Sequence, residues 1–145
     1  MPEPFAHGYL DADADGRLRP DEDMSVQSPS VAWTAGGMTS TAKDILSWLE
    51  AVASGAVLTP AMHEAQLTFD APVPAELQPD AAFGLGVADT AGAIGHTGGV
   101  LGYTSVMYAK NGASIVVLAN GYMLSGEGEA ANLIYERVAE VLYGG

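Results

Sequence analysis

Apolar positions in the middle of the chain recur at helical spacing. Intervals of three and four residues, typical of one apolar helix face, separate Ile45, Trp48, Leu49 and Val52. Ser40 or Thr41 can cap this helix at its start, and Gly55 is a natural end. A second, shorter helix is predicted from Thr59, a capping residue followed by Pro60, to about residue 67.

The second half of the chain has the pattern of a sheet. Residues 83–87 and 94–97 are short strand candidates, and residues 103–110 alternate between apolar and polar positions. Asn111-Gly112 then predicts a tight hairpin turn, because both turn residues need a positive φ. Residues 115–118 are apolar on both faces, so this strand should be covered on both sides.

The last helix is expected from about residue 129 to residue 142. One apolar stripe, which we expect to lie on the sheet, contains Ala130, Leu133, Ile134, Val138, Val141 and Leu142. Trp33 and Trp48 are interpreted as core residues.

These elements predict an α+β fold: an antiparallel sheet with a packed C-terminal helix, plus a small helical part. Residues 1–34 would form an acidic loop or hairpin segment, 35–80 a helical subdomain portion, and 81–145 the sheet and its helix. Residues 70–80, rich in proline and acidic side chains, are expected to be a loop. All three segments are interpreted as parts of one incomplete domain.

Charge and composition exclude several classes of function. The 145 residues include 18 acidic and 5 basic side chains, a formal net charge of -13, which disfavours nucleic acid and anionic lipid as partners. No apolar run approaches the ~20 residues of a membrane span, so no membrane insertion is expected. The first residues lack the pattern of a signal peptide. Without cysteine there is no disulfide and no thiolate, and the three histidines share no ligand spacing for zinc.

A glycine-rich segment at residues 95–103 carries candidate chemistry. It reads Gly-His-Thr-Gly-Gly-Val-Leu-Gly-Tyr, and its glycines let the backbone approach a ligand closely. His96 offers an imidazole and Thr97 a hydroxyl, which together could hold a carboxylate or an oxyanion. The spacing alone is equally typical of a glycine-rich turn with an incidental histidine.

Five segments in order along the chain carry a family resemblance. They are residues 6–9 (AHGY), 35–44 (AGGMTSTAKD), 83–86 (FGLG), 95–103 (GHTGGVLGY) and 117–120 (VLAN). With these motifs the chain resembles the serine β-lactamase and D-alanyl-D-alanine carboxypeptidase family, in the branch that includes class C enzymes and related esterases. The resemblance covers nearly the whole chain and implies a penicillin-recognising serine hydrolase that works through an acyl-enzyme.

The resemblance assigns roles to individual residues. The family site combines a Ser-x-x-Lys nucleophile, a Tyr-x-Asn motif and a Lys/His-Thr-Gly strand. His96-Thr97-Gly98 is similar to the third of these: the first residue sets a positive potential, and the hydroxyl contacts the substrate carboxylate. Gly99 would donate its backbone N–H to the oxyanion hole, and Tyr103 could line the pocket. Histidine in place of lysine is more similar to the peptidase and esterase branches.

The nucleophile is the main departure from the family. Ser40-Thr41-Ala42-Lys43 fits the letters Ser-x-x-Lys, but its place after Ala-Gly-Gly matches a later family helix, so Ser40 is interpreted as part of a helix cap. The isolated chain is therefore expected to be inactive. Its expected partners are the missing N-terminal portion of the same fold and a peptide, lactam or ester substrate, and a half-domain could also pair with a second copy. No cofactor is required, and the resemblance implies a periplasmic or extracellular location.

A second signal is an acidic stretch with the spacing of an EF-hand calcium loop. Asp11, Asp13 and Asp15 occupy positions 1, 3 and 5, Glu22 occupies position 12, and Arg17 would contribute its carbonyl at position 7. Against calcium, the flanking sequence does not predict helices, so a solvated turn remains the other interpretation. The alternative function is a stand-alone, non-catalytic binding module with this calcium loop.

Overall fold

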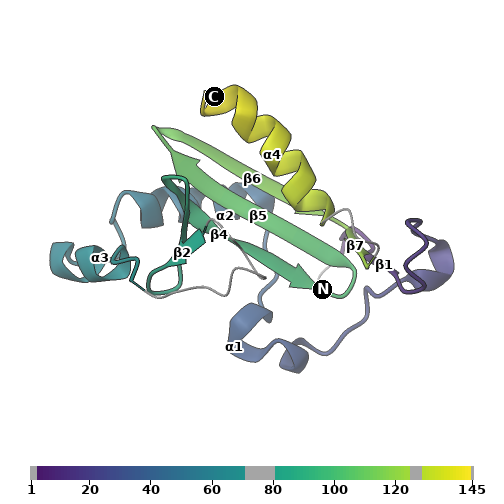
Figure 1. Ribbon diagram of the computed structural model, residues 1–145. Helices are drawn as coiled ribbons and strands as arrows, with labels where there is room; N and C mark the ends of the chain where they lie inside the picture. Colours follow the sequence, from purple (N-terminus) through teal and green to yellow (C-terminus); the bar gives the residue numbers. More distant parts are fainter. Residues whose placement is uncertain (1–2, 71–80, 125–128, 145) are drawn as a thin grey trace.

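The computed structural model, which describes residues 3–70, 81–124 and 129–144, is built around one antiparallel sheet (Figure 1). Its strands are, in spatial order, β2 (Ala81–Phe83), β3 (Ala88–Thr90), β4 (Ala93–Val100), β5 (Tyr103–Lys110) and β6 (Ala113–Ala119). Consecutive strands are neighbours throughout. The predicted α+β class, with an antiparallel sheet and a C-terminal helix, is confirmed.

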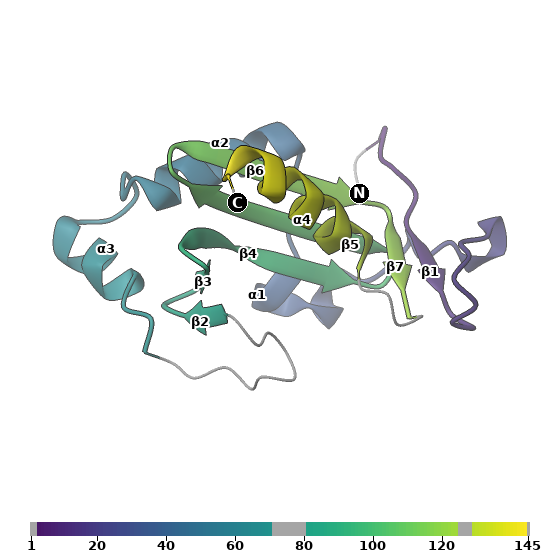
Figure 2. The same ribbon diagram turned by 45° about the horizontal axis from the view of Figure 1, so that its top comes forward.

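Helices cover both faces of this sheet (Figures 1 and 2). α4 (Ala130–Leu142) lies on one face, and α2 (Ala42–Ala53) lies on the other. The shorter α1 (Trp33–Gly36) and α3 (Pro60–Gln66) precede and follow α2, and 3-10 turns η1 (Pro20–Glu22) and η2 (Pro29–Val31) lie in the first third. No helix of the described residues has the length and apolar character to cross a membrane.

Local signals in the sequence placed the helix starts correctly. The Thr41 hydroxyl accepts a hydrogen bond from the Asp44 N–H at 3.2 Å, and the Thr59 hydroxyl accepts one from the Met62 N–H at 3.4 Å. Both are N-caps that satisfy a free donor of the first turn. The β5–β6 turn also agrees with prediction, since Asn111 and Gly112 have φ of 52° and 78°.

The core lies between α4 and the sheet. Val106 and Tyr108 of β5 are 1% and 2% exposed, and Ala131 of α4 is fully buried against them. Thr104 is buried beside Ala131: its hydroxyl donates to the Gly121 carbonyl at 3.3 Å and accepts from the Ala131 N–H at 3.4 Å. A strand side chain thus satisfies a donor in the first turn of α4, which has no cap of its own.

The predicted apolar stripe of α4 was wrong for most of its members. Four of them are 43% to 79% exposed: Leu133, Ile134, Val141 and Leu142. The sheet side is formed instead by Ala131, Tyr135 and Tyr143. The Tyr135 ring packs beside the Tyr108 ring, and the Tyr143 ring meets the Tyr135 ring edge-on. The short side chain of Ala131 allows the helix to approach the sheet closely. A tyrosine can bury its ring when its hydroxyl has a hydrogen-bond partner, and the Tyr143 hydroxyl donates to the Tyr108 carbonyl at 2.8 Å. The outward side of α4 therefore carries large apolar side chains alongside its charged ones.

Other boundaries and burials also differ from expectation. The strand candidate at 83–87 is the end of β2 followed by a turn, where Gly86 has a φ of 72°, and β3 was not predicted. Trp33 and Trp48 are 75% and 54% exposed rather than core, and Leu118 of β6 is 44% exposed. The loop expected at 70–80 lies, apart from its first residue, outside the described residues.

The acidic N-terminal segment contains a strand that its sequence did not indicate. β1 (Tyr9–Asp11) pairs in parallel with β7 (Gly121–Met123), forming a separate two-stranded sheet (Figure 2). Parallel neighbours far apart in the sequence carry no local turn signal, so the pairing was not predictable.

Candidate active-site strand

One edge of β4 is open over the length of the glycine-rich motif. β3 pairs with β4 only between residues 93 and 95, whereas β5 pairs with it as far as Val100. From His96 to Val100 the second edge has no partner strand among the described residues. A bare strand edge presents N–H and C=O groups on which an extended ligand can add as a further strand.

The open edge results from the short β3–β4 hairpin. Ala91 and Gly92 have φ of 52° and 80°, which produces a two-residue turn and pairs Thr90 with Ala93. β3 has only three residues, so its first residue, Ala88, already lies opposite Gly95. The pairing therefore stops one residue before His96.

His96 is held by a contact within its own strand. Its Nδ1 lies within hydrogen-bond distance of the Thr97 carbonyl, which can only accept, so Nδ1 would be the donor in this contact. Nε2 makes no hydrogen bond to the described residues. The Phe83 ring meets the imidazole edge-on with centroids 5.6 Å apart. The histidine is thus oriented by its neighbours, with one nitrogen left for chemistry.

His96 and Thr97 point to opposite faces of the sheet, because successive strand residues alternate. Thr97 lies opposite Val106, in the core beneath α4, whereas His96 lies opposite Met107 on the other face. The Thr97 hydroxyl makes no hydrogen bond to the described residues. Only a ligand lying along the open edge can meet both side chains. Whether the pair holds a carboxylate or an oxyanion stays a prediction.

Gly98 and Gly99 have no side chains, so the backbone of the open edge is not covered at these two positions. A Cβ on Gly98 would lie 2.7 Å from the Ser105 hydroxyl, and one on Gly99 would lie 3.0 Å from Tyr122 Cε2 and 3.1 Å from Glu129 Oε1. Tyr122 and Glu129 were not predicted as site residues, because they follow Gly99 by more than 20 residues and belong to none of the motifs found in the sequence.

The N-terminal segment anchors the turn at the end of β4. The Tyr103 hydroxyl donates to the Ala6 carbonyl at 2.8 Å, and a Cβ on Gly8 would lie 2.4 Å from the Tyr103 ring. Asn120 Nδ2 donates to the His7 carbonyl, also at 2.8 Å. In this chain the Tyr103 hydroxyl is therefore engaged by the scaffold, and a role in lining the pocket stays a prediction.

His7 belongs to a hydrogen-bonded cluster near the surface. Its Nδ1 lies 2.7 Å from Asp23 Oδ2, and the other carboxylate oxygen accepts from the Ser25 hydroxyl and from the Ser25 N–H. The hydrogen bond from the Ser25 hydroxyl, then that from His7 and then that from the Ser25 N–H lower the pKa of Asp23 to about 2. His63 does not belong to this cluster. It packs against Gly55, and its Nδ1 is buried without a hydrogen-bond partner among the described residues.

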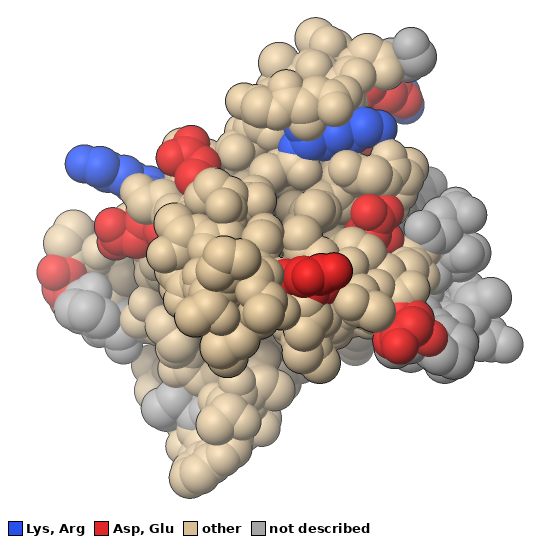
Figure 3. Space-filling model, turned by 90° about the vertical axis from the view of Figure 1, so that its left-hand side faces the viewer, with Lys and Arg blue, Asp and Glu red and all other residues tan. Residues whose placement is uncertain are grey.

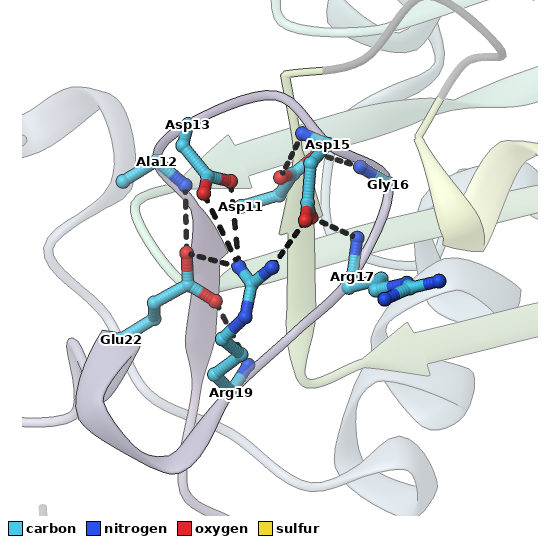
Figure 4. A network of polar contacts seen from close by, with 8 residues as sticks. All are labelled: Asp11, Ala12, Asp13, Asp15, Gly16, Arg17, Arg19 and Glu22. Carbon is cyan, nitrogen blue, oxygen red and sulfur yellow. Dashed lines mark hydrogen bonds and ion pairs between the residues drawn. The ribbon is translucent and has the colours of Figure 1, made fainter.

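The acidic loop gathers the three predicted carboxylates (Figure 4). One oxygen from each of Asp11, Asp13 and Asp15 lies within 4.8 Å of the others. The Arg19 guanidinium lies among them, with ion pairs to Asp13, Asp15 and Glu22. A positively charged side chain of the protein thus lies among the carboxylates that the sequence predicted to bind calcium.

Of the remaining predicted calcium ligands, the Glu22 carboxylate is engaged with the backbone. Glu22 accepts from the Ala12 N–H at 3.2 Å and the Arg19 N–H at 2.8 Å, and the Arg17 N–H donates to Asp15 at 3.0 Å. Calcium binding stays a prediction for this loop, in competition with Arg19.

Comparison with known proteins places this geometry in a family. Residues 1–139 match the family model described as Beta-lactamase. The chain belongs to the beta-lactamase family. A search of the curated proteins found no match.

A solved structure of a related enzyme is similar to this beta-lactamase family chain. It is the D-amino acid amidase from Ochrobactrum anthropi SV3, complexed with L-phenylalanine amide, at 26% identity and a TM-score of 0.72. The match covers 95% of this chain and 41% of the amidase chain. The chain thus spans about two fifths of that structure's length.

The surface of this beta-lactamase family chain is acidic with few basic side chains. Figure 3 shows acidic groups scattered over one largely uncharged face, with basic groups in two places. A net charge of -13 makes the surroundings of the open edge unfavourable for anions unless local cations compensate.

Proposed function

We propose that the chain is the C-terminal part of a serine hydrolase of the D-Ala-D-Ala carboxypeptidase, β-lactamase or esterase type. In this role β4 supplies one wall of the active site. The observation that carries the proposal is the open edge from His96 to Val100, where the family's His-Thr-Gly motif is followed by a second glycine. The backbone there is accessible to a substrate in extended conformation.

The chemistry expected of this strand follows from its groups. The Gly99 N–H would stabilise the oxyanion of the tetrahedral intermediate, and loss of one such donor typically costs about 10²–10³ in turnover. His96 Nε2 and the Thr97 hydroxyl would approach the substrate from the two faces of the edge. The nucleophilic serine and its base would come from the N-terminal portion.

Two surfaces support the proposal that an N-terminal portion completes the domain. The outward side of α4 exposes large apolar side chains, with Val141 79% and Leu142 54% exposed. β6 ends the strand order and has no described partner on its outer edge. Exposed apolar side chains on a helix beside an unpaired edge strand favour association, either with the rest of the fold or with a second copy.

Intact mass spectrometry tests the part of the proposal that concerns the nucleophile. The chain alone, incubated with a reactive β-lactam, should form no covalent adduct, because Ser40 is exposed before α2 and Thr41 is the helix cap. A stoichiometric adduct on the chain would overturn this assignment.

Co-expression with an N-terminal portion that carries Ser-x-x-Lys and Tyr-x-Asn tests whether β4 supplies one wall of the active site. Ester hydrolysis should return only in the complex, and Thr97→Val should reduce kcat/KM, whereas the exposed Thr39→Val should not. Hydrolysis that is unaffected by Thr97→Val would argue against the role of β4. A reading frame upstream that encodes an unrelated domain would favour the alternative, a stand-alone binding module.

A further inference from the structure

Glu129 brings a carboxylate to the oxyanion strand. It lies at the start of α4, and its Oε1 is 3.1 Å from the position that a Cβ on Gly99 would occupy. The carboxylate therefore lies directly over the Gly99 backbone, on the α4 face of β4. Glycine at position 99 leaves room for this approach.

The Glu129 carboxylate has no partner of its own. Among the described residues it forms no hydrogen bond and no ion pair. It is partly buried, and burial raises its pKa above the ordinary value of a glutamate. A partly buried carboxylate without a counter-charge loses part of its hydration, and a cation that binds there would offset this loss.

The chain itself supplies no cation to this place. None of its five basic residues pairs with Glu129 in the described part of the chain: Arg17, Arg19, Lys43, Lys110 and Arg137. The side chain of His96 lies on the opposite face of β4. A substrate carboxylate at Gly99 would therefore meet a negative group, whereas a substrate ammonium would meet a complementary one.

We propose that Glu129 binds the ammonium group of an amino-acid amide or ester, so that the site prefers substrates with a free amine over substrates with a carboxylate. The inference rests on the proposed function and narrows its substrate class, because a preference for a free amine favours the esterase type over the two types whose substrates carry a carboxylate. In such a substrate the ammonium is attached to the carbon next to the scissile carbonyl. When the carbonyl oxygen accepts the Gly99 N–H, the ammonium comes within reach of the carboxylate above Gly99.

Titration of backbone amide NMR signals tests this binding on the chain itself. Phenylalanine amide, in both enantiomers, is compared with 3-phenylpropanamide, which has the same ring and amide but no amine. The amine-bearing amide should shift the signals of residues 98–100 and bind about tenfold or more tightly than the matched amide, as expected for a charge-assisted hydrogen bond. Glu129→Gln should remove that difference, and Glu136→Gln on the exposed side of α4 should keep it.

The outcomes separate this inference from the proposal on which it rests. If both amides shift the β4 signals and Glu129→Gln leaves the preference unchanged, ammonium recognition by Glu129 is wrong while the substrate strand stands. If neither amide shifts the β4 signals, the substrate strand itself is wrong, and this inference falls with it. Benzylpenicillin, which bears a carboxylate, should bind more tightly to Glu129→Gln than to the native chain.

Discussion

The ring of Tyr103 lies directly on Gly8, so that a β-carbon at position 8 would be 2.4 Å from the ring and 2.7 Å from the Gly102 carbonyl. This contact joins the N-terminal segment to the turn that ends the candidate substrate strand. It explains why a glycine stands beside His7.

Gly8→Ala should therefore destabilise the fold. The added methyl overpacks a site bounded by backbone and an anchored ring, which typically costs about 1–3 kcal/mol. Urea denaturation measures the loss. Gly36→Ala is the control, because its nearest neighbour would be 3.4 Å away, and it should change stability by less than about 0.5 kcal/mol. Equal stability of Gly8→Ala and the native chain would contradict the packing described here.

Thr104→Val should destabilise the attachment of α4 to the sheet. The substitution keeps the shape of a side chain that is 2% exposed but removes the hydroxyl that serves the Ala131 N–H and the Gly121 carbonyl. Leaving buried groups unpaired typically costs about 1–3 kcal/mol. Thermal unfolding gives the difference, and Thr39→Val at an exposed position is the matched control. Unchanged stability would mean that these groups find other partners.

Glu129 predicts a pH dependence of stability with a definite sign. Its pKa is raised in the folded state, so at mildly acidic pH the folded chain binds more protons than the unfolded chain. Its contribution to stability therefore decreases as pH rises through the raised pKa. Glu129→Gln should remove this decrease and be at least as stable as the native chain at neutral pH, whereas Glu136→Gln should keep the native profile. A less stable Glu129→Gln at neutral pH would disprove the account.

Asp23 predicts a pH dependence of stability with the opposite sign. The pKa of its carboxyl group is lowered from 3.8 to about 2, chiefly by the Ser25 hydroxyl. Its contribution to stability is therefore present above pH 3.8 and is lost as the pH falls toward 2. In Ser25→Ala the pKa of Asp23 should rise toward its ordinary value. NMR titration of the carboxyl carbon measures it directly. An unshifted pKa in that variant would mean that His7, 2.7 Å away, is the main cause.

Arg19 decides whether the acidic loop can bind calcium. Its guanidinium pairs with Asp13, Asp15 and Glu22, so Arg19→Met should leave mutually repelling carboxylates and make loop stability more dependent on salt. Calcium titration calorimetry then tests the hypothesis that came from the sequence. Heat at millimolar calcium, lost in Asp13→Ala and larger in Arg19→Met, would support a site. No heat in either the native chain or Arg19→Met would eliminate it.

Local physical preferences made several elements readable from the sequence alone. Thr41 and Thr59 cap helices because a hydroxyl serves N–H groups two or three residues away, and Asn111-Gly112 turns because both residues accept a positive φ. Each of these preferences acts within about four residues. The ordered motifs, read together, also indicated the family to which the chain belongs.

Relationships between distant residues were decided only by the tertiary structure. Which side of α4 faces the sheet depended on the fit of Ala131 and Tyr135 against Tyr108, and counting apolar residues gave the wrong side. The pairing of β1 with β7 likewise depends on packing, since no turn connects them. The sequence by itself determined the glycine-rich strand and its His96-Thr97 pair. The short β3 that leaves its edge open, and the placing of Glu129 over Gly99 from 30 residues away, followed from how the strands and α4 pack together.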